Sequence, residues 1–341
     1  MNEPAPQSSD KQVAEAVRPT APAQIANLLL RLTSFREFTI AAVIVAVCVG
    51  MSLYDPRLFL TRENLLNVLL SLSVESIVAI GMTILLVSGG FDLSVGSTFA
   101  MTGAVTASCM THGVPVPLAI VIGMATGALI GLINGVFIAK IGINAFITTL
   151  AMMSIVRGIL HVMMGSGSIV GLPESFKVIG QGNAFGIQFP IFIALFLVLT
   201  GDFLLRKSRF FRQSYYIGGN ERAAALSGIA VNRIKIFNYA LTGCLAALAG
   251  IVMTARLGSA SNTAGKDLEL RVITAVVIGG ASLQGGEGTV FGAFLGSLLM
   301  GILISSLNMV GVDARWNMLV SGATLLIAVL IDTVSKRRRV T

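Results

Sequence analysis

Residues 118–138 read LAIVIGMATGALIGLINGVFI and contain no charged side chain. About 20 apolar residues suffice to cross the hydrocarbon core of a bilayer as one helix. Gly123, Gly127, Gly131 and Gly135 recur at every fourth position and therefore lie along one face of that helix. Small residues at this spacing let two helix backbones approach closely. The stretch predicts a membrane-spanning helix that packs tightly against another.

The whole chain has the same character. Of its 341 residues, 55% are hydrophobic and 12% are charged, and the mean hydropathy is +0.86. An average soluble domain carries about 25% charged residues, so the composition excludes a soluble fold. Glycine is abundant and aromatic residues are few, which suits packed helices better than a β-barrel with aromatic girdles. We predict an all-α integral membrane protein.

Apolar runs bounded by polar, Gly or Pro breaks predict about ten transmembrane helices. Six lie within residues 38–205 and four within 236–334, with a polar, basic loop at 206–235 between them. The runs are 38–54, 65–88, 94–111, 118–138, 144–164, 188–205, 236–256, 270–284, 289–308 and 316–334. The stretches near 89–97 and 270–284 are candidates for broken or re-entrant segments, because both contain a glycine pair and the second is short for a span.

The positions of lysine and arginine predict the orientation. With the N-terminal tail in the cytoplasm and each run crossing once, 16 of the 24 cations fall on the cytoplasmic side and seven on the other, while Arg157 lies inside a span. Cytoplasmic loops usually carry the excess of positive charge. We therefore expect both termini in the cytoplasm, with a disordered tail at 1–37 and a basic tail at 335–341. The net charge of +8 then reflects orientation rather than nucleic-acid binding.

The sequence lacks the motifs of common catalytic and cofactor sites. It contains no GxxxxGK[ST] phosphate loop, no GxSxG and no HExxH. Cys48, Cys109 and Cys244 lie in apolar runs, with no CxxC and no metal-like spacing to His112 or His161. We expect no ATP hydrolysis by this chain alone, no catalytic residue, no bound metal and no cofactor.

A few polar side chains lie inside predicted spans, where an ionisable group is costly and needs a partner or a purpose. Glu75 lies in the second span, and Arg157 and His161 lie four residues apart on one face of the fifth. An ion pair between Glu75 and Arg157 is the structural interpretation, and solute contact is the functional one. The groups that can bond either a hydroxyl-rich solute or a neighbouring helix belong to Asn134, Asn144, Thr148, Thr149 and Asn308.

Two further glycine patterns occur. Gly288, Gly292 and Gly296 repeat the four-residue spacing in the ninth predicted span and indicate a second tight helix contact. The stretch VSGGFDLSVG at 87–96 is echoed by VIGGASLQGG at 277–286, with five matching positions. Each is a break between apolar runs that can expose backbone groups to a pathway. A repeat and a coincidence both remain open.

The basic loop 206–235 contains a helix signal. An Asn at the N-cap, an acidic first turn, an Ala-rich body and a C-terminal Gly predict a two-turn helix outside the membrane. The residues concerned are Gly218, Gly219, Asn220, Glu221, Arg222, Ala223, Ala224, Ala225, Leu226, Ser227 and Gly228. Its small-residue face suits docking into a groove of another protein. A surface helix that only connects two halves is the alternative.

Four long motifs in order resemble the permease subunit of bacterial ABC importers of the ribose, xylose and galactoside class, a family also used for autoinducer-2. They are Gly89–Ser97, Thr149–Gly158, Gly218–Ile229 and Ile273–Gly280. The resemblance covers nearly the whole chain. Phe91 stands where that family usually has Ile, and Ala225 where Arg or Lys is frequent; both departures bear on the fit to partners.

The resemblance implies a multi-pass protein of the bacterial inner (plasma) membrane. Two permease subunits, identical or paralogous, would form the pathway for a monosaccharide or similar small polar solute. Two cytoplasmic ATP-binding subunits would bind beneath them, and a periplasmic or extracellular solute-binding protein would deliver the solute. By position, Gly218 to Gly228 would be the helix that couples to the ATPase, with Glu221 and Arg222 setting its register. The residues expected to border the path are Asp92, Ser94, Asn134, Asn144, Thr148 and Thr149.

Two other classes of protein fit the sequence less well. An ion-coupled secondary transporter of a small polar solute would need more carboxylates within its spans than Glu75, Asp92, Asp202 and Asp332 supply, and would need no docking helix. An intramembrane enzyme is disfavoured because no nucleophile, base or metal constellation is present. An ABC importer permease is the leading hypothesis.

Overall fold

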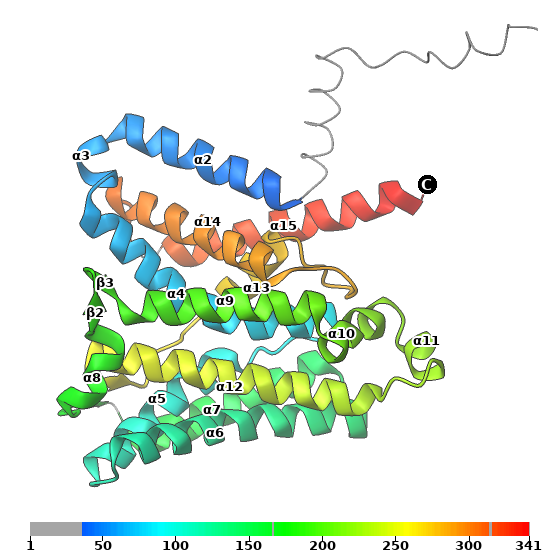
Figure 1. The fold of residues 1–341 in the computed structure, drawn as a ribbon, viewed down its shortest axis with the longest axis horizontal. Helices are drawn as coiled ribbons and strands as arrows, with labels where there is room; N and C mark the ends of the chain where they lie inside the picture. The colour runs from blue at the N-terminus through cyan, green and yellow to red at the C-terminus, as the bar shows by residue number, and fades with distance from the viewer. Residues whose placement is uncertain (1–35, 166, 314–315, 341) are drawn as a thin grey trace, which may run out of the picture.

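The computed structural model describes residues 36–165, 167–313 and 316–340, with the backbone alone for Arg36 and residues 331–340. Most of these residues are helical, and the long helices lie side by side in one bundle (Figure 1). The prediction of a disordered tail at 1–37 falls outside the described residues except at its end, where a helix begins at Arg36. The basic stretch at 335–340 continues the last helix.

Capping residues and glycines set many of the helix boundaries. Thr61 and Thr289 cap two helices with their hydroxyl oxygens, and Gly142 ends another in the left-handed conformation. The helices are α2 (Arg36–Tyr54), α3 (Pro56–Phe59), α4 (Arg62–Val87), α5 (Val95–Thr111), α6 (Val116–Val136) with the π-turn η1 (Phe137–Ile141), α7 (Ala145–Met164), α8 (Glu174–Gln181), α9 (Phe189–Lys207), α10 (Arg209–Gly219), α11 (Glu221–Leu226), α12 (Val231–Leu257), α13 (Leu268–Ile278), α14 (Val290–Met309) and α15 (Trp316–Val340).

Seven described helices are long and apolar enough to cross a membrane: α2, α4, α6 with η1, α7, α9, α12 and α14. The predicted count of ten is therefore too high for full-length spans. The runs predicted at 94–111 and 270–284 form the shorter helices α5 and α13, and the run at 316–334 lies within the 25-residue helix α15. Hydropathy detects all three as apolar, but it does not give the length of the helix that each run forms.

Helices α5 and α13 are short because the chain breaks next to them. Residues 88–94 form turns between α4 and α5, and Gly279 to Thr289 form turns between α13 and α14. At 1.5 Å per residue, the 11 residues of α13 span about 16 Å, roughly half of a hydrocarbon core about 30 Å thick. The first turns of the two helices meet, since Gly96 of α5 packs directly against Glu269 of α13.

The all-α prediction holds apart from two antiparallel ladders of two residues per strand. Strand β1 (Ser168–Ile169) pairs with β4 (Ala260–Ser261), and β2 (Asn183–Ala184) pairs with β3 (Ile187–Gln188) as a hairpin. The β2–β3 hairpin and α8 lie at one end of the bundle, and α10 and α11 lie at the opposite end (Figure 1). The two ends are therefore built from different chain segments.

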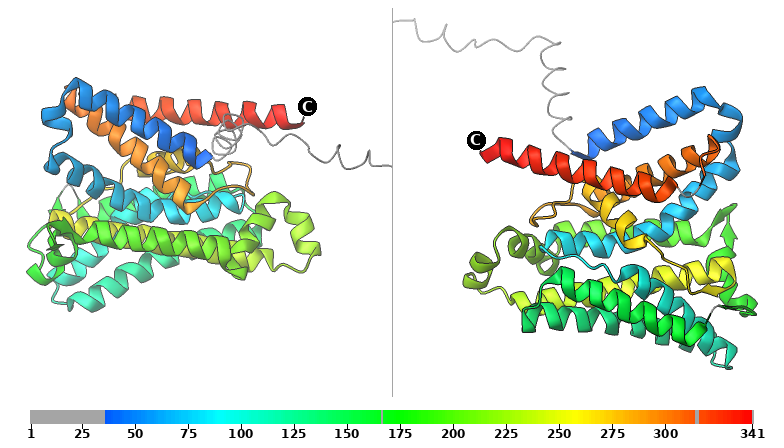
Figure 2. Two further views of the ribbon diagram at one scale, coloured as in Figure 1. Left: turned by 45° about the horizontal axis from the view of Figure 1, so that its top comes forward. Right: turned by 180° about the vertical axis from the view of Figure 1, so that it is seen from behind.

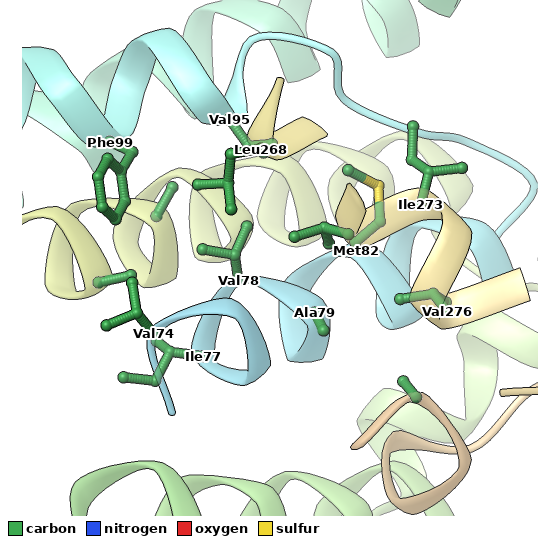
Figure 3. Close-up of a cluster of buried hydrophobic side chains, with 14 of the residues drawn as sticks. Val74, Ile77, Val78, Ala79, Met82, Val95, Phe99, Leu268, Ile273 and Val276 are labelled. Atoms are coloured by element: carbon green, nitrogen blue, oxygen red, sulfur yellow. The ribbon is translucent and has the colours of Figure 1, made fainter. Parts of the chain in front are cut away.

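Helix α4 lies at the centre of the fold. Its side chains Val78 and Met82 pack with Phe99 of α5 and with Val272 and Val276 of α13 in the main hydrophobic cluster (Figure 3). The second half of α4, from Ser76 to Val87, is buried all round, which is typical of a helix in a core position. Helices α2, α14 and α15 lie on one side of this centre, and α5, α6 and α7 lie on the other (Figure 2).

Candidate functional site

Helix α11 forms where the sequence predicts it. The Asn220 side-chain oxygen accepts a hydrogen bond from the Ala223 N–H at 3.0 Å, which caps the first turn. Gly228 follows with φ +83, and the Ile229 N–H closes the helix on the Ala224 carbonyl at 3.1 Å. Leu226 at the last turn is 91% exposed. A helix closed at both ends therefore presents one large apolar side chain to its surroundings.

The opposite side of α11 is anchored to the protein. Ala224 is buried with Ile217, Val231 and Ile234 in a small hydrophobic cluster. Glu221, which was expected to set the register of a partner, lies 2.6 Å from the Lys235 ammonium at the start of α12, whereas Arg222 is exposed. Glu221 thus ties α11 to α12, and Arg222, Ala225 and Leu226 remain accessible.

Both glycine breaks meet beneath the end of α10. The Gly286 N–H donates to the Val87 carbonyl at 2.9 Å and so joins the second break to the end of α4. Gly218 packs against both groups so closely that a Cβ atom there would overlap them. The Tyr215 hydroxyl donates to the Gly288 carbonyl at 2.7 Å, and burial raises the pKa of Tyr215. The segment that carries α11 is therefore in direct contact with the ends of α4 and α14.

Three of the predicted pathway residues form one buried cluster. One Asp92 carboxylate oxygen accepts from the Ser94 N–H at 2.7 Å and from its hydroxyl at 2.6 Å, and the other accepts from the Asn134 amide at 3.2 Å. Asn134 also donates to the Ser94 hydroxyl at 2.9 Å. Tyr239 of α12 donates to the Phe91 carbonyl at 3.1 Å beside this cluster. The cluster ties the first break to α6, while α12 holds its neighbouring backbone.

The other three predicted pathway residues lie apart from this cluster, on or beside α7. Asn144 is exposed and caps α7 by accepting from the Phe146 N–H at 2.8 Å. Thr149 donates to the Ala145 carbonyl at 2.8 Å. The buried Thr148 hydroxyl has no hydrogen-bond partner among the described residues. Of these three residues, Thr148 alone therefore has a hydroxyl group that is buried and unused.

The predicted ion pair between Glu75 and Arg157 is wrong. Glu75 pairs with Arg271 of α13, whose Nε lies 2.8 Å from the carboxylate. Arg157 instead donates to the backbone carbonyls of Asn262 and Ala264 at 3.0 and 2.9 Å. It thereby holds the segment after α12 against α7, while His161 on the next turn is exposed. Arg271 lies at the start of the run predicted at 270–284, and its place in the first turn of α13 brings it within reach of α4.

The glycine stripe of α6 makes the tight contact that its spacing predicts. A Cβ atom on Gly127, Gly131 or Gly135 would meet the backbone of α12, and one on Gly123 would meet Thr106 and Ile251. In the second series, Gly292 and Gly296 pack against the backbone of α13, at Gly279 and Ala275. The prediction that Gly288 belongs to this stripe is wrong, because Gly288 lies in the break before α14 with φ +144 and is not part of the helix.

Helix α10 was not predicted. Its sequence RFFRQSYYIGG has a strongly basic start, so a hydropathy reading places it in a loop. The sequence pattern that indicates this helix is a spacing of three to four residues between the side chains that face the bundle, which are Phe211, Ser214, Tyr215 and Gly218. Among the described residues, no group of three or more His, Cys, Asp or Glu side chains is placed to hold a metal ion.

Replacing Asp92 by alanine is expected to lower the thermal stability of the purified protein. The change removes the acceptor for three hydrogen bonds and leaves buried donors unpaired, at about 1–3 kcal/mol for each unsatisfied group. Asp92→Asn keeps an acceptor at the same place and should cost less. Thermal unfolding in detergent measures both variants, and equal stability of Asp92→Ala and Asp92→Asn would contradict a role for the cluster in holding the break.

Comparison with known proteins finds a matching family model and several similar proteins. Residues 64–329 match the family model described as branched-chain amino acid transport system / permease component. The ribose import permease protein RbsC of Escherichia coli strain K12 is 43% identical over 298 residues, which cover 86% of this chain and 92% of that protein. RbsC of Haemophilus influenzae is 41% identical over 313 residues, covering 91% and 95%. The L-arabinose ABC transporter permease protein AraH of Azospirillum brasilense is 37% identical over 281 residues, covering 82% and 83%. No solved structure matches the chain.

Proposed function

Since the chain belongs to the branched-chain amino acid transport system permease family and aligns with most of the length of a ribose import permease, we propose that it forms the membrane pathway of an ABC importer for a pentose or similar monosaccharide. It is a multi-pass membrane protein and is not itself an ATPase. A second permease subunit, identical or paralogous, completes the pathway. ATP-binding subunits and a solute-binding protein complete the importer.

The observation that carries this proposal is the placement of α11 relative to the two breaks. Leu226 and Arg222 face outward, where an ATPase subunit would dock. The preceding helix α10 contacts the ends of α4 and α14 through Gly218 and Tyr215. Closure of the ATPase subunits on ATP would move α11 and α10 together and shift both breaks. Such a movement would favour one of two states of the pathway, because the contacts made by α10 and α11 differ between the two states.

In this arrangement both termini and α11 lie on the cytoplasmic side, and the β2–β3 hairpin lies on the side from which the solute arrives. The Asp92, Ser94 and Asn134 cluster borders the path at the first break, with Thr148 and Thr149 on α7 and Asn144 at its start. The excess of lysine and arginine in the 206–235 region supports this orientation. Replacing Thr148 by valine, which keeps the shape and removes the unused hydroxyl, tests its part in transport.

Uptake of the solute is expected to stop when ATP is depleted, and to continue when the proton or sodium gradient is collapsed at constant ATP. The physical reason is that the energy enters through α11 and not through titratable groups in the spans. Radiolabelled ribose, arabinose and xylose taken up by cells that express the importer provide the measurement. Uptake that survives ATP depletion and collapses with the ion gradient would establish the alternative, an ion-coupled secondary transporter.

A further inference from the structure

A polar stripe on α4 contains Glu75, whose pair with Arg271 is described above, and two residues that have no part in the site described so far. Asn67, Ser71 and Glu75 are four residues apart and therefore share one face of this otherwise apolar helix. Asn67 and Ser71 are exposed, and Glu75 is half-buried. Polar and ionisable groups on a membrane helix rarely face lipid, and they face protein or a water-filled cavity instead. This face of α4 therefore borders water or another protein chain.

The stripe lines a cavity of about 520 Å³ between α4, α13, α14 and α15. Small-molecule sites typically have volumes of about 300–1,000 Å³. Asn308 of α14 and Asn317 and Ser321 of α15 contribute further amide and hydroxyl groups to the lining. The Asn317 side-chain oxygen is buried and has no hydrogen-bond partner among the described residues. The cavity thus offers amide and hydroxyl groups from three helices.

The charged groups of the cavity restrict what it can hold. Arg271 is occupied by the Glu75 carboxylate at 2.8 Å and by the Lys266 carbonyl at 3.3 Å. Asp267 adds a second carboxylate to the lining. With two carboxylates against one paired guanidinium, an anionic solute meets net repulsion. Amides, hydroxyls and a paired carboxylate together match a neutral molecule that carries many hydroxyl groups, since each hydroxyl both donates and accepts.

The cavity lies far from the α10–α11 end of the molecule. Ser71 precedes Val87 by 16 residues along α4, a distance of about 24 Å at 1.5 Å per residue. Val87 contacts Gly218 and Gly286 at the other end. Arg62 at the start of α4 lies 3.4 Å from the Gly186 carbonyl in the β2–β3 turn, so the cavity lies toward the end of the bundle that carries this hairpin. In the proposed orientation this is the side on which a solute enters.

We propose that this cavity is a solute-contact site within the permease, which accepts a neutral polyhydroxylated molecule of pentose size and excludes its phosphorylated form. The assignment rests on the proposed transport function. It places the candidates Glu75 and Asn308 in one cavity and adds Asn67, Ser71, Arg271 and Asn317 to them. The binding protein would select the solute, and this cavity would receive it after release.

Cysteine accessibility tests the proposal without relying on transport. Ser71→Cys is compared with Ser154→Cys, which is exposed on α7 near the exposed apolar side chains of Leu150 and Ile155, in a chain whose Cys48, Cys109 and Cys244 are replaced by alanine. The complete importer is held in lipid nanodiscs and treated with a charged methanethiosulfonate. Because the thiolate is the reactive form and forms poorly in lipid, Ser71→Cys should react at least about tenfold faster than Ser154→Cys. Equal rates would overturn a water-filled cavity.

Solute protection is the second readout. D-ribose, L-arabinose or D-xylose at saturating concentration should slow modification of Ser71→Cys, and ribose 5-phosphate should not. Modification that none of the three sugars slows would overturn the solute site, and equal protection by ribose 5-phosphate would overturn the charge selectivity. A wild-type complex that transports none of the sugars would instead count against the proposed function, while the labelling rates would still report water access.

A blocking variant links the cavity to transport. Ser71→Phe fills the space beside Glu75 and should reduce sugar uptake by about tenfold or more, the scale expected for obstructing a site built for a small ligand. ATP hydrolysis stimulated by the loaded binding protein should remain, because α11 is untouched. Ser154→Phe should leave both activities unchanged. Normal uptake by a correctly inserted Ser71→Phe variant would contradict the proposal.

Discussion

Leu226→Asp is expected to abolish solute-stimulated ATP hydrolysis and uptake while the permease still inserts and folds. Leu226 is 91% exposed, although it is a large apolar side chain, and it lies at the end of a helix that is capped and anchored. Burying a leucine in a partner contributes about 1.5–3 kcal/mol. Losing that contact alone weakens docking by about ten- to a hundredfold. A buried, unpaired carboxylate adds a further desolvation cost.

Conservative and partial variants separate this effect from misfolding. Leu226→Met keeps the apolar contact and should retain most of the stimulated hydrolysis, while Leu226→Ala should show an intermediate loss. Co-purification of the ATPase subunits with each permease variant measures docking directly, and thermal unfolding of the permease checks the fold. If Leu226→Asp still binds the ATPase subunits and stimulates hydrolysis, α11 is a connecting surface helix and the coupling proposal fails.

Substitutions of Glu221 and of Arg222 are expected to have different effects, although the sequence analysis assigns both residues to the register of the docked helix. Glu221 is held by Lys235 at 2.6 Å, so its loss acts on the attachment of α11 to α12. That pair is partly exposed, and such pairs are worth only about 0–1 kcal/mol. Arg222 is exposed and free to meet a partner. Substitution of the apolar Leu226 therefore tests docking more directly than substitution of Glu221 or Arg222.

Gly131→Leu is expected to prevent stable folding. A Cβ atom on Gly131 would overlap the Tyr239 carbonyl oxygen and press on the Cα atom of Ala240. Both are backbone atoms, so no rotamer change can make room and α6 must move away from α12. Overpacking typically costs about 1–3 kcal/mol, and a whole leucine against backbone should reach or exceed the upper end of that range. The expected readouts are low membrane yield and early thermal aggregation in detergent.

A glycine in an open position provides the matched control. Gly158 on α7 has nothing within 4 Å of its Cβ position and is exposed. Gly158→Leu should keep the wild-type yield and thermal stability, and a small gain is expected because glycine is a poor helix former by roughly 0.5–1 kcal/mol. Equal behaviour of the Gly131 and Gly158 variants would mean that α6 and α12 are not held together by the glycine stripe.

Hydropathy and short-range patterns predicted most of the helices. The cap of α11 depends on Asn220, Ala223 and Gly228, which are close together in the chain, so its form could be read directly from the sequence. The stripe on α6 likewise depends on a four-residue repeat. In contrast, α10 was missed because its charges outweigh its apolar spacing in a hydropathy reading. The count of full-length spans was too high because the hydropathy of an apolar run does not show how long a helix it forms.

By itself, the amino-acid sequence determined the membrane environment, the helical class, the tight face of α6 and the capped helix α11, since all of these follow from residues within a few positions of one another. Only the tertiary structure decided which distant groups meet. Glu75 pairs with Arg271, 196 positions away, and not with Arg157. The Val87 carbonyl meets the Gly286 N–H, which joins the two breaks. Such contacts depend on how whole helices pack, and side-chain spacing along one helix carries no information about the position of another.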